Sequence, residues 1–315
     1  MKIVILDAST LGEDTDLSGF GEFGSVEVHG TTLPEEVTEA LAGADIAVVN
    51  KVRLTKDILF RCPSLRLICV AATGYDNIDI GACRAKGIAV CNVPGYSTES
   101  VAQVTLAMAL SLTTHLTEYQ NYIRSGAYSL GGVANRLVPV YHDLSSMTWG
   151  VVGYGNIGKK VAAVAKEIGC RVLICREHPI GDENERDIDT ICKECDVISL
   201  HTPLQDSTRG LIGRERLRLM KNSAVLINVS RGAVIDEGAV AEAIREERLG
   251  GFGSDVYTSE PFSEDHPFYA IRNLENVCLT PHMAWGSFES RSRCIREMLG
   301  NIRSFLSGNN LNRIV

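Results

Sequence analysis

Short runs of aliphatic and β-branched residues recur along the chain, and stretches of helical length separate each run from the next. Runs without polar alternation are typical of strands in a parallel sheet that helices cover on both faces. Strands that alternate with helices therefore predict an α/β protein. The predicted strands are 3–6, 46–49, 67–71, 88–91, 151–153, 172–175, 197–200, 225–228 and 277–279.

Length and composition narrow the class of protein further. A chain of 315 residues has room for about two domains, and 45% hydrophobic with 22% charged residues is an ordinary globular composition. The formal net charge of -8 and the lack of a basic patch argue against a nucleic-acid partner. Apolar runs such as 67–72 are far shorter than the ~18 residues of a membrane span. The N-terminal apolar stretch stops at Asp7, too short for a signal peptide, so we expect a cytoplasmic protein.

Ten cysteines are present, and most of them lie inside apolar segments, as Cys69, Cys175 and Cys278 do. This placement favours buried free thiols over a disulfide framework. Cys192 and Cys195 form a lone CxxC, which supplies only two of the four ligands of a structural zinc site. We therefore expect no metal centre and interpret the pair as packing at a helix end.

A glycine motif follows the strand predicted at 151–153. Gly153, Gly155 and Gly158 have GxGxxG spacing, and a helix and a second strand complete the unit within about thirty residues. In such a unit the first glycine permits a tight turn, the second lets the backbone approach a pyrophosphate, and the third lets helix and strand pack closely. The helix N-terminus then offers N–H groups to the anion. The segment predicts a Rossmann dinucleotide site.

The residue after the second strand of this unit bears on the choice of cofactor. An Asp or Glu there would take the ribose hydroxyls of NAD, whereas a guanidinium can pair with the 2′-phosphate of NADP. This chain has Arg176, with Glu177 beside it. We therefore favour NADP(H) and keep NAD(H) as the alternative.

Three polar residues stand just beyond later strands: Arg231, Glu260 and His282. Ligands of parallel α/β sheets gather at the carboxyl ends of the strands. Reduction of a 2-oxo acid needs a cation for the carboxylate, which Arg provides, and an acid for the carbonyl oxygen, which His provides near neutral pH. A carboxylate beside the imidazole would orient it and favour its protonated form.

These motifs resemble the D-isomer-specific 2-hydroxyacid dehydrogenase family over essentially the whole chain. The matching segments are VAATGYDNID at 70–79, GYGNIG at 153–158, HTPL at 201–204, LINVSRG at 226–232, SDVYTSEP at 254–261 and PHMAW at 281–285. The resemblance implies that His282 is the acid/base, Glu260 its partner and Arg231 the substrate anchor. It also implies that Asp255 faces the nicotinamide carboxamide.

The resemblance extends to the binding residues. The substrate contacts that it implies are Asn50, Ala72, Thr73, Gly74 and Arg231. The cofactor contacts are Gly153, Tyr154, Gly155, Asn156, Ile157, Gly158, Arg176, Thr202, Pro203, Thr208, Val229, Ser230, Arg231, Asp255, His282 and Ala284. The turn at 72–74 would offer backbone N–H groups to the substrate carboxylate, which suits a glycine-containing turn after a strand.

The same resemblance implies the domain plan. Two Rossmann-like or flavodoxin-like domains with parallel sheets are expected: a substrate domain at 1–96 and 285–315, and a dinucleotide-binding domain inserted at 97–284. Pro94 and Gly95 mark the first boundary, before one long apolar helix at about 98–124. We expect this helix and the loop after it to form a homodimer interface. A last helix, ending near residue 306, should pack back on the first domain.

Alternatives stay open for single residues. Arg231 could be a surface ion-pair partner, Glu260 a residue before a turn, and His282 a buried structural histidine. His201 also follows a strand and competes with His282, but no acid equivalent to Glu260 follows it, so we interpret it as cofactor-side or structural. The other histidines, at 29, 115, 142, 178 and 266, are expected at the surface or in loops.

The substrate is less clearly specified. The segments at 50–52, 94–103 and 281–285 look most like the glycerate dehydrogenase or hydroxypyruvate reductase branch of the family. Segment 129–143 departs from the family pattern, as do Ser146 and Met147, where a Gly-Lys pair is common. A bulkier 2-oxo acid is therefore an alternative substrate. A nonenzymatic, dinucleotide-dependent corepressor-like module and a formate-type dehydrogenase on the same scaffold are further alternatives.

Overall fold

The computed structural model describes all 315 residues, and they form two compact units. The first unit comprises Met1–Ser97 and Trp285–Val315, and the second comprises Thr98–Ala284. Each unit has a single parallel sheet of its own. None of the helices has the length and apolar character that a membrane crossing requires.

The sheet of the first unit has the strand order β2-β1-β3-β4-β5. This is the flavodoxin-like order of a doubly wound sheet. The strands are β1 (Lys2–Ile5), β2 (Ser25–Val28), β3 (Ile46–Val49), β4 (Leu67–Val70) and β5 (Ala89–Cys91). The helices are α1 (Val37–Ala40), α2 (Lys56–Arg61), α3 (Ile80–Lys86) and α11 (Phe288–Leu306), with 3-10 turns at Ala8–Leu11 and Ser18–Phe23.

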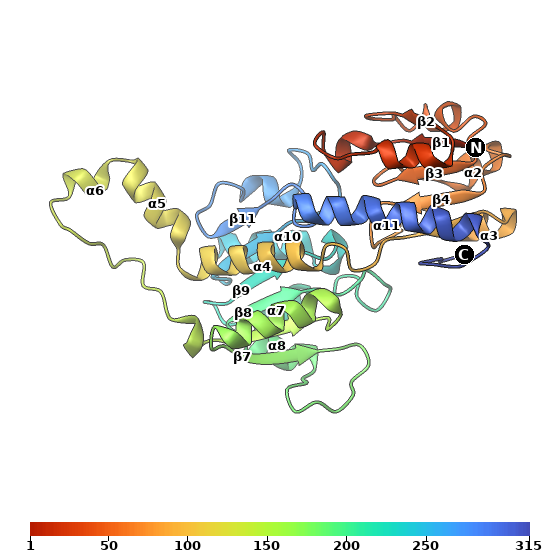
Figure 1. Ribbon diagram of the computed structural model, residues 1–315. Coiled ribbons are helices and arrows are strands. Elements are labelled where there is room, and N and C mark those ends of the chain that lie inside the picture. Colours follow the sequence, from red (N-terminus) through yellow and green to blue (C-terminus); the bar gives the residue numbers. More distant parts are fainter. The chain divides into compact units, whose positions relative to one another are not determined.

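Both faces of this sheet are buried. On one face, Val4, Val49 and their neighbours pack against helices α1, α2 and α3. The other face packs Ile5 and Val48 under α11, whose residues Cys294 and Met298 are fully buried. The C-terminal helix therefore returns to the sheet formed by the first residues of the chain (Figure 1).

The sheet of the second unit has the order β11-β10-β9-β8-β6-β7, with every pair of neighbours parallel. Its strands are β6 (Thr148–Val152), β7 (Arg171–Cys175), β8 (Val197–Leu200), β9 (Val225–Asn228), β10 (Gly251–Ser254) and β11 (Val277–Leu279). The chain order reverses between β6 and β8, because β7 pairs with β6 on the other side. Ligands of open α/β sheets bind at such a switch point.

Helices cover both faces of the second sheet (Figure 1). The helices of this unit are α4 (Thr98–Thr113), α5 (Leu116–Arg124), α6 (Ala127–Leu130), α7 (Asn156–Glu167), α8 (Ile188–Glu194), α9 (Arg214–Leu219) and α10 (Glu237–Arg245). The unit also has 3-10 turns at Leu144–Ser146, Gly232–Val234 and Pro267–Ala270. Helices α4 and α7 pack on one face around the fully buried Trp149, and α8, α9 and α10 pack on the other.

The prediction of one helix over 98–124 is wrong. The structure has two helices, α4 and α5, because His115 adopts a left-handed backbone conformation with φ of 51° that an α-helix cannot contain. Helix α5, α6 and the segment up to residue 143 extend away from the sheet of this unit (Figure 1). The exposed apolar side chains of this arm are Leu116, Ile123, Tyr128, Leu130, Val133, Leu137, Val138, Val140 and Tyr141.

Two strands were not expected. Strand β2 lies at the edge of its sheet and has the polar residues Ser25 and Glu27, so it lacks a continuous apolar run. Strand β10 contains Gly251 and Gly253, which have low strand propensity. A Cβ atom on Gly253 would lie 3.2 Å from Sδ of Met108 in α4, so the strand uses glycine where the helix packs closely.

All ten cysteines are free thiols, as expected from their apolar surroundings. Eight of them are buried, and Cys175 and Cys278 are half-buried. Cys192 and Cys195 are fully buried in the core between the sheet and α8. Burial raises the pKa of both thiols to about 12, so neither behaves as a reactive redox cysteine.

Candidate active site

The predicted chemical residues of the second unit follow the carboxyl ends of its strands. Gly153 follows β6, Arg176 follows β7, Arg231 lies three residues beyond β9, and His282 lies three residues beyond β11. Because all six strands are parallel, these residues are at one edge of the sheet. Ligands of open α/β sheets usually bind at this edge.

His282 and Glu260 form a close pair. Nδ1 of His282 lies 2.6 Å from Oε2 of Glu260, and the two side chains are 24% and 29% exposed. The backbone N–H of Tyr257 donates to the other carboxylate oxygen, Oε1, over 3.0 Å. The carboxylate is thereby fixed on one side and orients the imidazole on the other, while both groups keep access to solvent.

A tight turn presents His282, and Asp255 holds that turn. The φ of His282 is 52°, a left-handed conformation that is uncommon outside glycine. The buried Asp255 carboxylate accepts hydrogen bonds from Oγ1 of Thr280 (2.6 Å) and from the N–H groups of Met283 (2.8 Å) and Ala284 (2.9 Å). Burial raises the pKa of Asp255 in spite of these donors. Asp255 thus serves the turn that carries the histidine.

The turn after β9 places Arg231. Asn228 donates from Nδ2 to the carbonyl of Arg231 over 2.9 Å and accepts from the N–H and hydroxyl of Ser230. Gly232, the next residue, lies against the segment that leads to Glu260: a Cβ atom there would lie 2.1 Å from the carbonyl carbon of Tyr257. The Arg231 turn and the Glu260 segment are therefore in direct backbone contact.

The glycine motif forms a cradle at the end of β6. Gly153 has a φ of 89°, and a Cβ atom there would lie within 2.7 Å of the backbone of His201 and Thr202. A Cβ atom on Gly158 would lie 2.0 Å from the carbonyl oxygen of Gly153, so helix α7 packs directly on the turn. Gly155, in contrast, faces open space. The cradle fits a dinucleotide pyrophosphate, since it is closed toward the protein and open at the helix N-terminus.

Arg176 is held in place at the end of β7. Its Nε pairs with Oε1 of Glu185 over 2.6 Å, and its guanidinium lies 4.4 Å from the ring centroid of Tyr154, within the glycine motif. Oε2 of Glu185 accepts hydrogen bonds from the backbone N–H groups of Ile180, Gly181 and Asp182. The guanidinium is thus held by Glu185 at its Nε atom and by the Tyr154 ring on one face of its plane.

His201 is unsuited to acid/base work near neutral pH. Its Nε2 lies 2.9 Å from Oγ of Ser199, which also accepts a hydrogen bond from Nε1 of Trp149. Burial lowers the pKa of His201 to about 3. The imidazole is neutral at physiological pH, which favours His282 over His201 as the acid.

In the first unit, the predicted substrate contacts follow β3 and β4, which are adjacent strands. The backbone N–H of Asn50 donates to Asp7, and the hydroxyl of Thr73 donates to the carbonyl of Val93 over 2.9 Å. Asn77 donates from Nδ2 to the carbonyls of Asn50 and Val52, so the turn after β4 is tied to the loop after β3. The backbone N–H groups of Thr73 and Gly74 donate to no group of the chain.

The chain matches the family model "D-isomer specific 2-hydroxyacid dehydrogenase, NAD binding domain" over residues 106–284. The chain belongs to this family. It is 35% identical over 307 residues to a glycerate dehydrogenase of Methylorubrum extorquens, covering 98% of this chain and 96% of that protein. It is 31% identical over 321 residues to a hydroxypyruvate reductase of Blautia hydrogenotrophica, covering 99% of both. An acyclic imino acid reductase solved with NADPH and D-Arg superposes with a TM-score of 0.86 at 30% identity, covering 100% of both chains.

Membership of the D-2-hydroxyacid dehydrogenase family establishes the class of activity. The chain is an oxidoreductase that uses a nicotinamide dinucleotide and acts on a 2-oxo or 2-hydroxy acid. The α/β fold with two parallel sheets, predicted from the strand pattern and the resemblance, is also confirmed.

The remaining predicted cofactor residues of this dehydrogenase lie at the same sheet edge. Thr202 and Pro203 follow β8, and the hydroxyl of Thr208 donates to the carbonyl of Pro203 over 2.6 Å, which closes their loop. The carbonyl of Ala284 accepts a hydrogen bond from Oγ of Ser100 at the start of α4. The other residues of this set, which follow β6 or β9, are Tyr154, Asn156, Ile157, Val229 and Ser230.

Sequence reasoning missed three residues that organise these sites. Asp7 accepts hydrogen bonds from the N–H groups of Asn50, Lys51 and Val52, and its position directly after an apolar strand was a usable signal.

Glu237 and His266 form a buried pair next to the Glu260 segment. His266 lies in a loop, which is one of the two locations expected for it, but its side chain is buried and only 6% exposed. No local pattern marked it, since its partner is 29 residues away.

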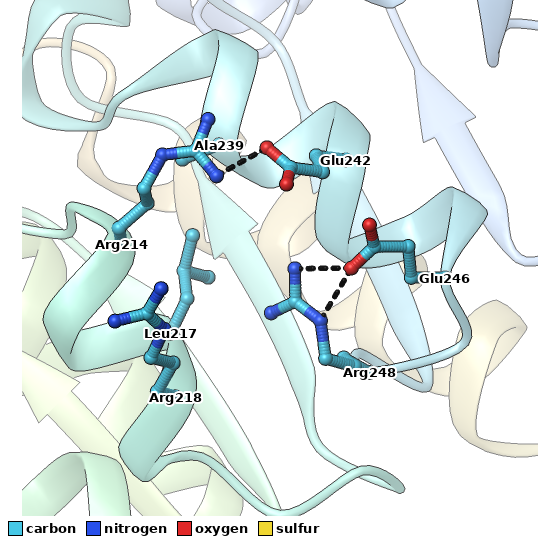
Figure 2. A pocket seen from close by; sticks show the side chains of 7 residues that line it. All are labelled: Arg214, Leu217, Arg218, Ala239, Glu242, Glu246 and Arg248. Atoms are coloured by element: carbon cyan, nitrogen blue, oxygen red, sulfur yellow. Dashed lines mark hydrogen bonds and ion pairs between the residues drawn. The ribbon is translucent and has the colours of Figure 1, made fainter.

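A surface hollow of about 180 Å³ between α9 and α10 is separate from this chemistry (Figure 2). Arg214 pairs with Glu242 there, and Arg248 pairs with Glu246 over 2.7 Å. Its other lining residues are Leu217, Arg218 and Ala239, and none of the predicted site residues lines it. Salt bridges at the protein surface, not a reaction centre, account for its charges.

Proposed function

We propose that this dehydrogenase reduces a small 2-oxo acid to the D-2-hydroxy acid. The observation that carries the proposal is the 2.6 Å pair of His282 and Glu260 at the same sheet edge as the glycine cradle. A bound reduced nicotinamide supplies the hydride. The chain must then supply a proton donor for the carbonyl oxygen and a cation for the carboxylate.

His282 is the proton donor in this proposal. Its Nδ1 is directed at Glu260, which gives the imidazole a fixed orientation. The proton that goes to the substrate oxygen leaves from the imidazole, and oxidation of the hydroxy acid returns it. Arg231 grips the substrate carboxylate, for which the planar guanidinium fork is well suited. Its backbone is held by Asn228 and by the contact of Gly232 with the Glu260 segment.

The first unit supplies further substrate contacts in this proposal. The backbone N–H groups of Thr73 and Gly74 are available to a carboxylate, and the turn that carries them is tied down through Thr73 and Asn77. Asn50 and Ala72 border the same turn region at the ends of β3 and β4. We assign the substrate role to this unit and the cofactor role to the second unit.

We propose hydroxypyruvate or glyoxylate as the substrate type. The matched proteins include a glycerate dehydrogenase, a hydroxypyruvate reductase and glyoxylate reductases, which supports a small polar 2-oxo acid. Segment 129–143, which departs from the family pattern, lies in the exposed arm of the second unit. A bulkier 2-oxo acid is the alternative that the experiment below tests.

NADP(H) is the preferred cofactor in this proposal. Arg176 is fixed by Glu185 and Tyr154, which leaves its terminal nitrogens to meet a 2′-phosphate. The superposed imino acid reductase was solved with NADPH, which also supports this preference. NAD(H) is the alternative.

We also propose a homodimer and a cytoplasmic location. The arm formed by α5, α6 and residues 131–143 exposes Leu130 to 88% and Leu137 to 74%, more apolar surface than a free monomer usually leaves in one place. Ten free thiols are compatible with a reducing compartment. Light scattering at micromolar concentration should give twice the mass of the chain, and a monomeric mass would contradict the dimer.

A cofactor-by-substrate matrix tests the proposed function. NADPH and NADH are each combined with hydroxypyruvate, glyoxylate, pyruvate and phenylpyruvate, and kcat/KM is measured for each pair. We expect the highest values with NADPH and hydroxypyruvate or glyoxylate. Tight NADPH binding without turnover on any of these acids would favour a corepressor-like binding module. Highest turnover with phenylpyruvate would favour the bulkier substrate.

A further inference from the structure

A buried acid and a buried histidine lie behind the Glu260 segment. Glu237 is the first residue of α10, and its side chain is 7% exposed; that of His266 is 6% exposed. Nε2 of His266 lies 3.0 Å from Oε2 of Glu237. Buried charged groups are costly unless hydrogen bonds satisfy them, so the partners of this pair indicate its role.

The hydrogen bonds define the protonation of the histidine. The backbone N–H of Phe268 donates to Nδ1 of His266 over 3.2 Å. Since a backbone N–H can only donate, Nδ1 carries the lone pair and the ring proton is on Nε2. His266 is therefore a neutral donor to the Glu237 carboxylate.

The same carboxylate holds the start of the Glu260 segment. The N–H of Thr258 donates to Oε1 of Glu237 over 2.9 Å, and the hydroxyl of Thr258 donates to Oε2. Glu237 thus accepts three hydrogen bonds, one of them from His266. Thr258 and His266 are the two ends of an irregular segment, 258–266, and Glu260 lies within it. One carboxylate ties both ends of the segment to helix α10.

We propose that Glu237 and His266 are positioning residues for the Glu260–His282 pair. The inference rests on the proposed function, in which Glu260 orients the acid/base. The segment has no helix or strand of its own, and most of its side chains are exposed, so the Glu237 clamp supplies order that the local backbone lacks. Misplacement of a catalytic group by about 1 Å can cost up to ~100-fold in rate.

The test is a double-mutant cycle of Glu237→Gln and Glu260→Gln. The side-chain amide of E237Q keeps the shape, but in either orientation its N–H₂ group faces an N–H donor, that of the Thr258 backbone or that of the His266 ring, which breaks the clamp. We expect E237Q alone to lower kcat about tenfold or more, with KM for the 2-oxo acid and Kd for NADPH within about twofold of the wild-type values. In the Glu260→Gln background, E237Q should lower kcat by less than about twofold, because the group it positions is already gone.

Two further variants keep the test decisive. Glu242→Gln, on the same helix but in the surface pair with Arg214, should leave kcat unchanged (Figure 2). Thr258→Val removes only the hydroxyl contact and should lower kcat in the same direction by a smaller factor. It replaces E237Q in the cycle if that variant does not fold, as judged by circular dichroism and NADPH binding.

The outcomes separate the two levels of the proposal. If Glu260→Gln has no effect on kcat, the proposed function of that residue is wrong. If Glu260→Gln lowers kcat but E237Q lowers it equally in both backgrounds, the clamp acts on something other than Glu260 and the inference is wrong. An unchanged kcat for a folded E237Q variant also overturns it.

Discussion

Nδ1 of His282 lies 2.6 Å from Oε2 of Glu260, although the two residues belong to different loops of the second unit. The loop after β10 fixes both residues: its Asp255 holds the turn of His282, and its Tyr257 N–H holds the carboxylate of Glu260. The pair is therefore assembled by the sheet edge and does not depend on a bound substrate to bring its members together.

Replacement of His282 by Ala removes the proposed proton donor. We expect kcat to fall by about 10² to 10⁴, the range for lost general acid catalysis, in steady-state assays with hydroxypyruvate and NADPH. Binding of NADPH, measured by fluorescence titration, should change little. His201→Ala is the comparison for the competing histidine, and a larger kcat loss there than in the His282 variant would reverse the assignment.

Gly232→Ala should damage the site through the backbone. The added methyl group would lie 2.1 Å from the carbonyl carbon and 2.6 Å from the Cα of Tyr257, so the Glu260 segment must move. We expect a loss of stability of about 1–3 kcal/mol in denaturant unfolding, together with a lower kcat. Gly238→Ala is the matched control, because its new methyl group would meet only the Asp236 carboxylate, at 3.4 Å. Equal behaviour of the two variants would argue against the contact.

Arg176→Ala tests the selection of the cofactor. Loss of a charge-assisted hydrogen bond costs about 1.5–3 kcal/mol, so the ratio of kcat/KM for NADPH to that for NADH should fall roughly 10- to 100-fold. Arg171→Ala, at the start of the strand that Arg176 follows and paired with Glu194 at the surface, should leave the ratio unchanged. A wild-type kcat/KM for NADH equal to or above that for NADPH would contradict the proposed preference.

The half-buried His201, whose Nδ1 is shielded from solvent, predicts a dependence of stability on pH. Its pKa is about 3 in the folded chain, below the ordinary value of 6.5 for histidine, so the unfolded chain binds the extra proton between these two pH values. Stability from this group is present above pH 6.5 and is lost as pH falls toward 3. Relative to His201→Gln, the wild type should lose roughly 2 kcal/mol of unfolding free energy between pH 6 and pH 4. If the unfolding free energies of the two proteins changed in parallel across that range, the pKa of the His201 ring would not be lowered by desolvation.

Most of the fold was predictable because its strands are buried on both faces. Continuous runs such as IAVV at Ile46–Val49 have few other interpretations, and four of the predicted strands have the observed bounds. Strand β10 was missed because it contains glycine where helix α4 packs on it. Gly253 leaves room for Met108, and a contact between residues so far apart in the sequence cannot be recognised from the residues around Gly253. The break between α4 and α5 at His115 was missed because its left-handed backbone does not use glycine.

The site was predictable where the chemistry follows a strand directly. Arg176, Arg231 and His282 stand within three residues of the ends of β7, β9 and β11, so topology alone brings them to one edge. The supporting contacts were not predictable in the same way. Asp255 binds donors 25 to 29 residues away, and Glu237 meets His266 across 29 residues, so these roles require the folded chain.

The two sets of predicted contacts are divided between the units. Arg231, Glu260 and His282 all come from loops of the second unit, whereas Asn50 and the turn at 72–74 come from the first. Under the proposed roles, we expect substitutions in the loops after β3 and β4 to change which acid is accepted, while the contacts of His282 and Glu260 stay intact. A library restricted to residues 50–52 and 72–77 would be the economical route to new substrates on this scaffold.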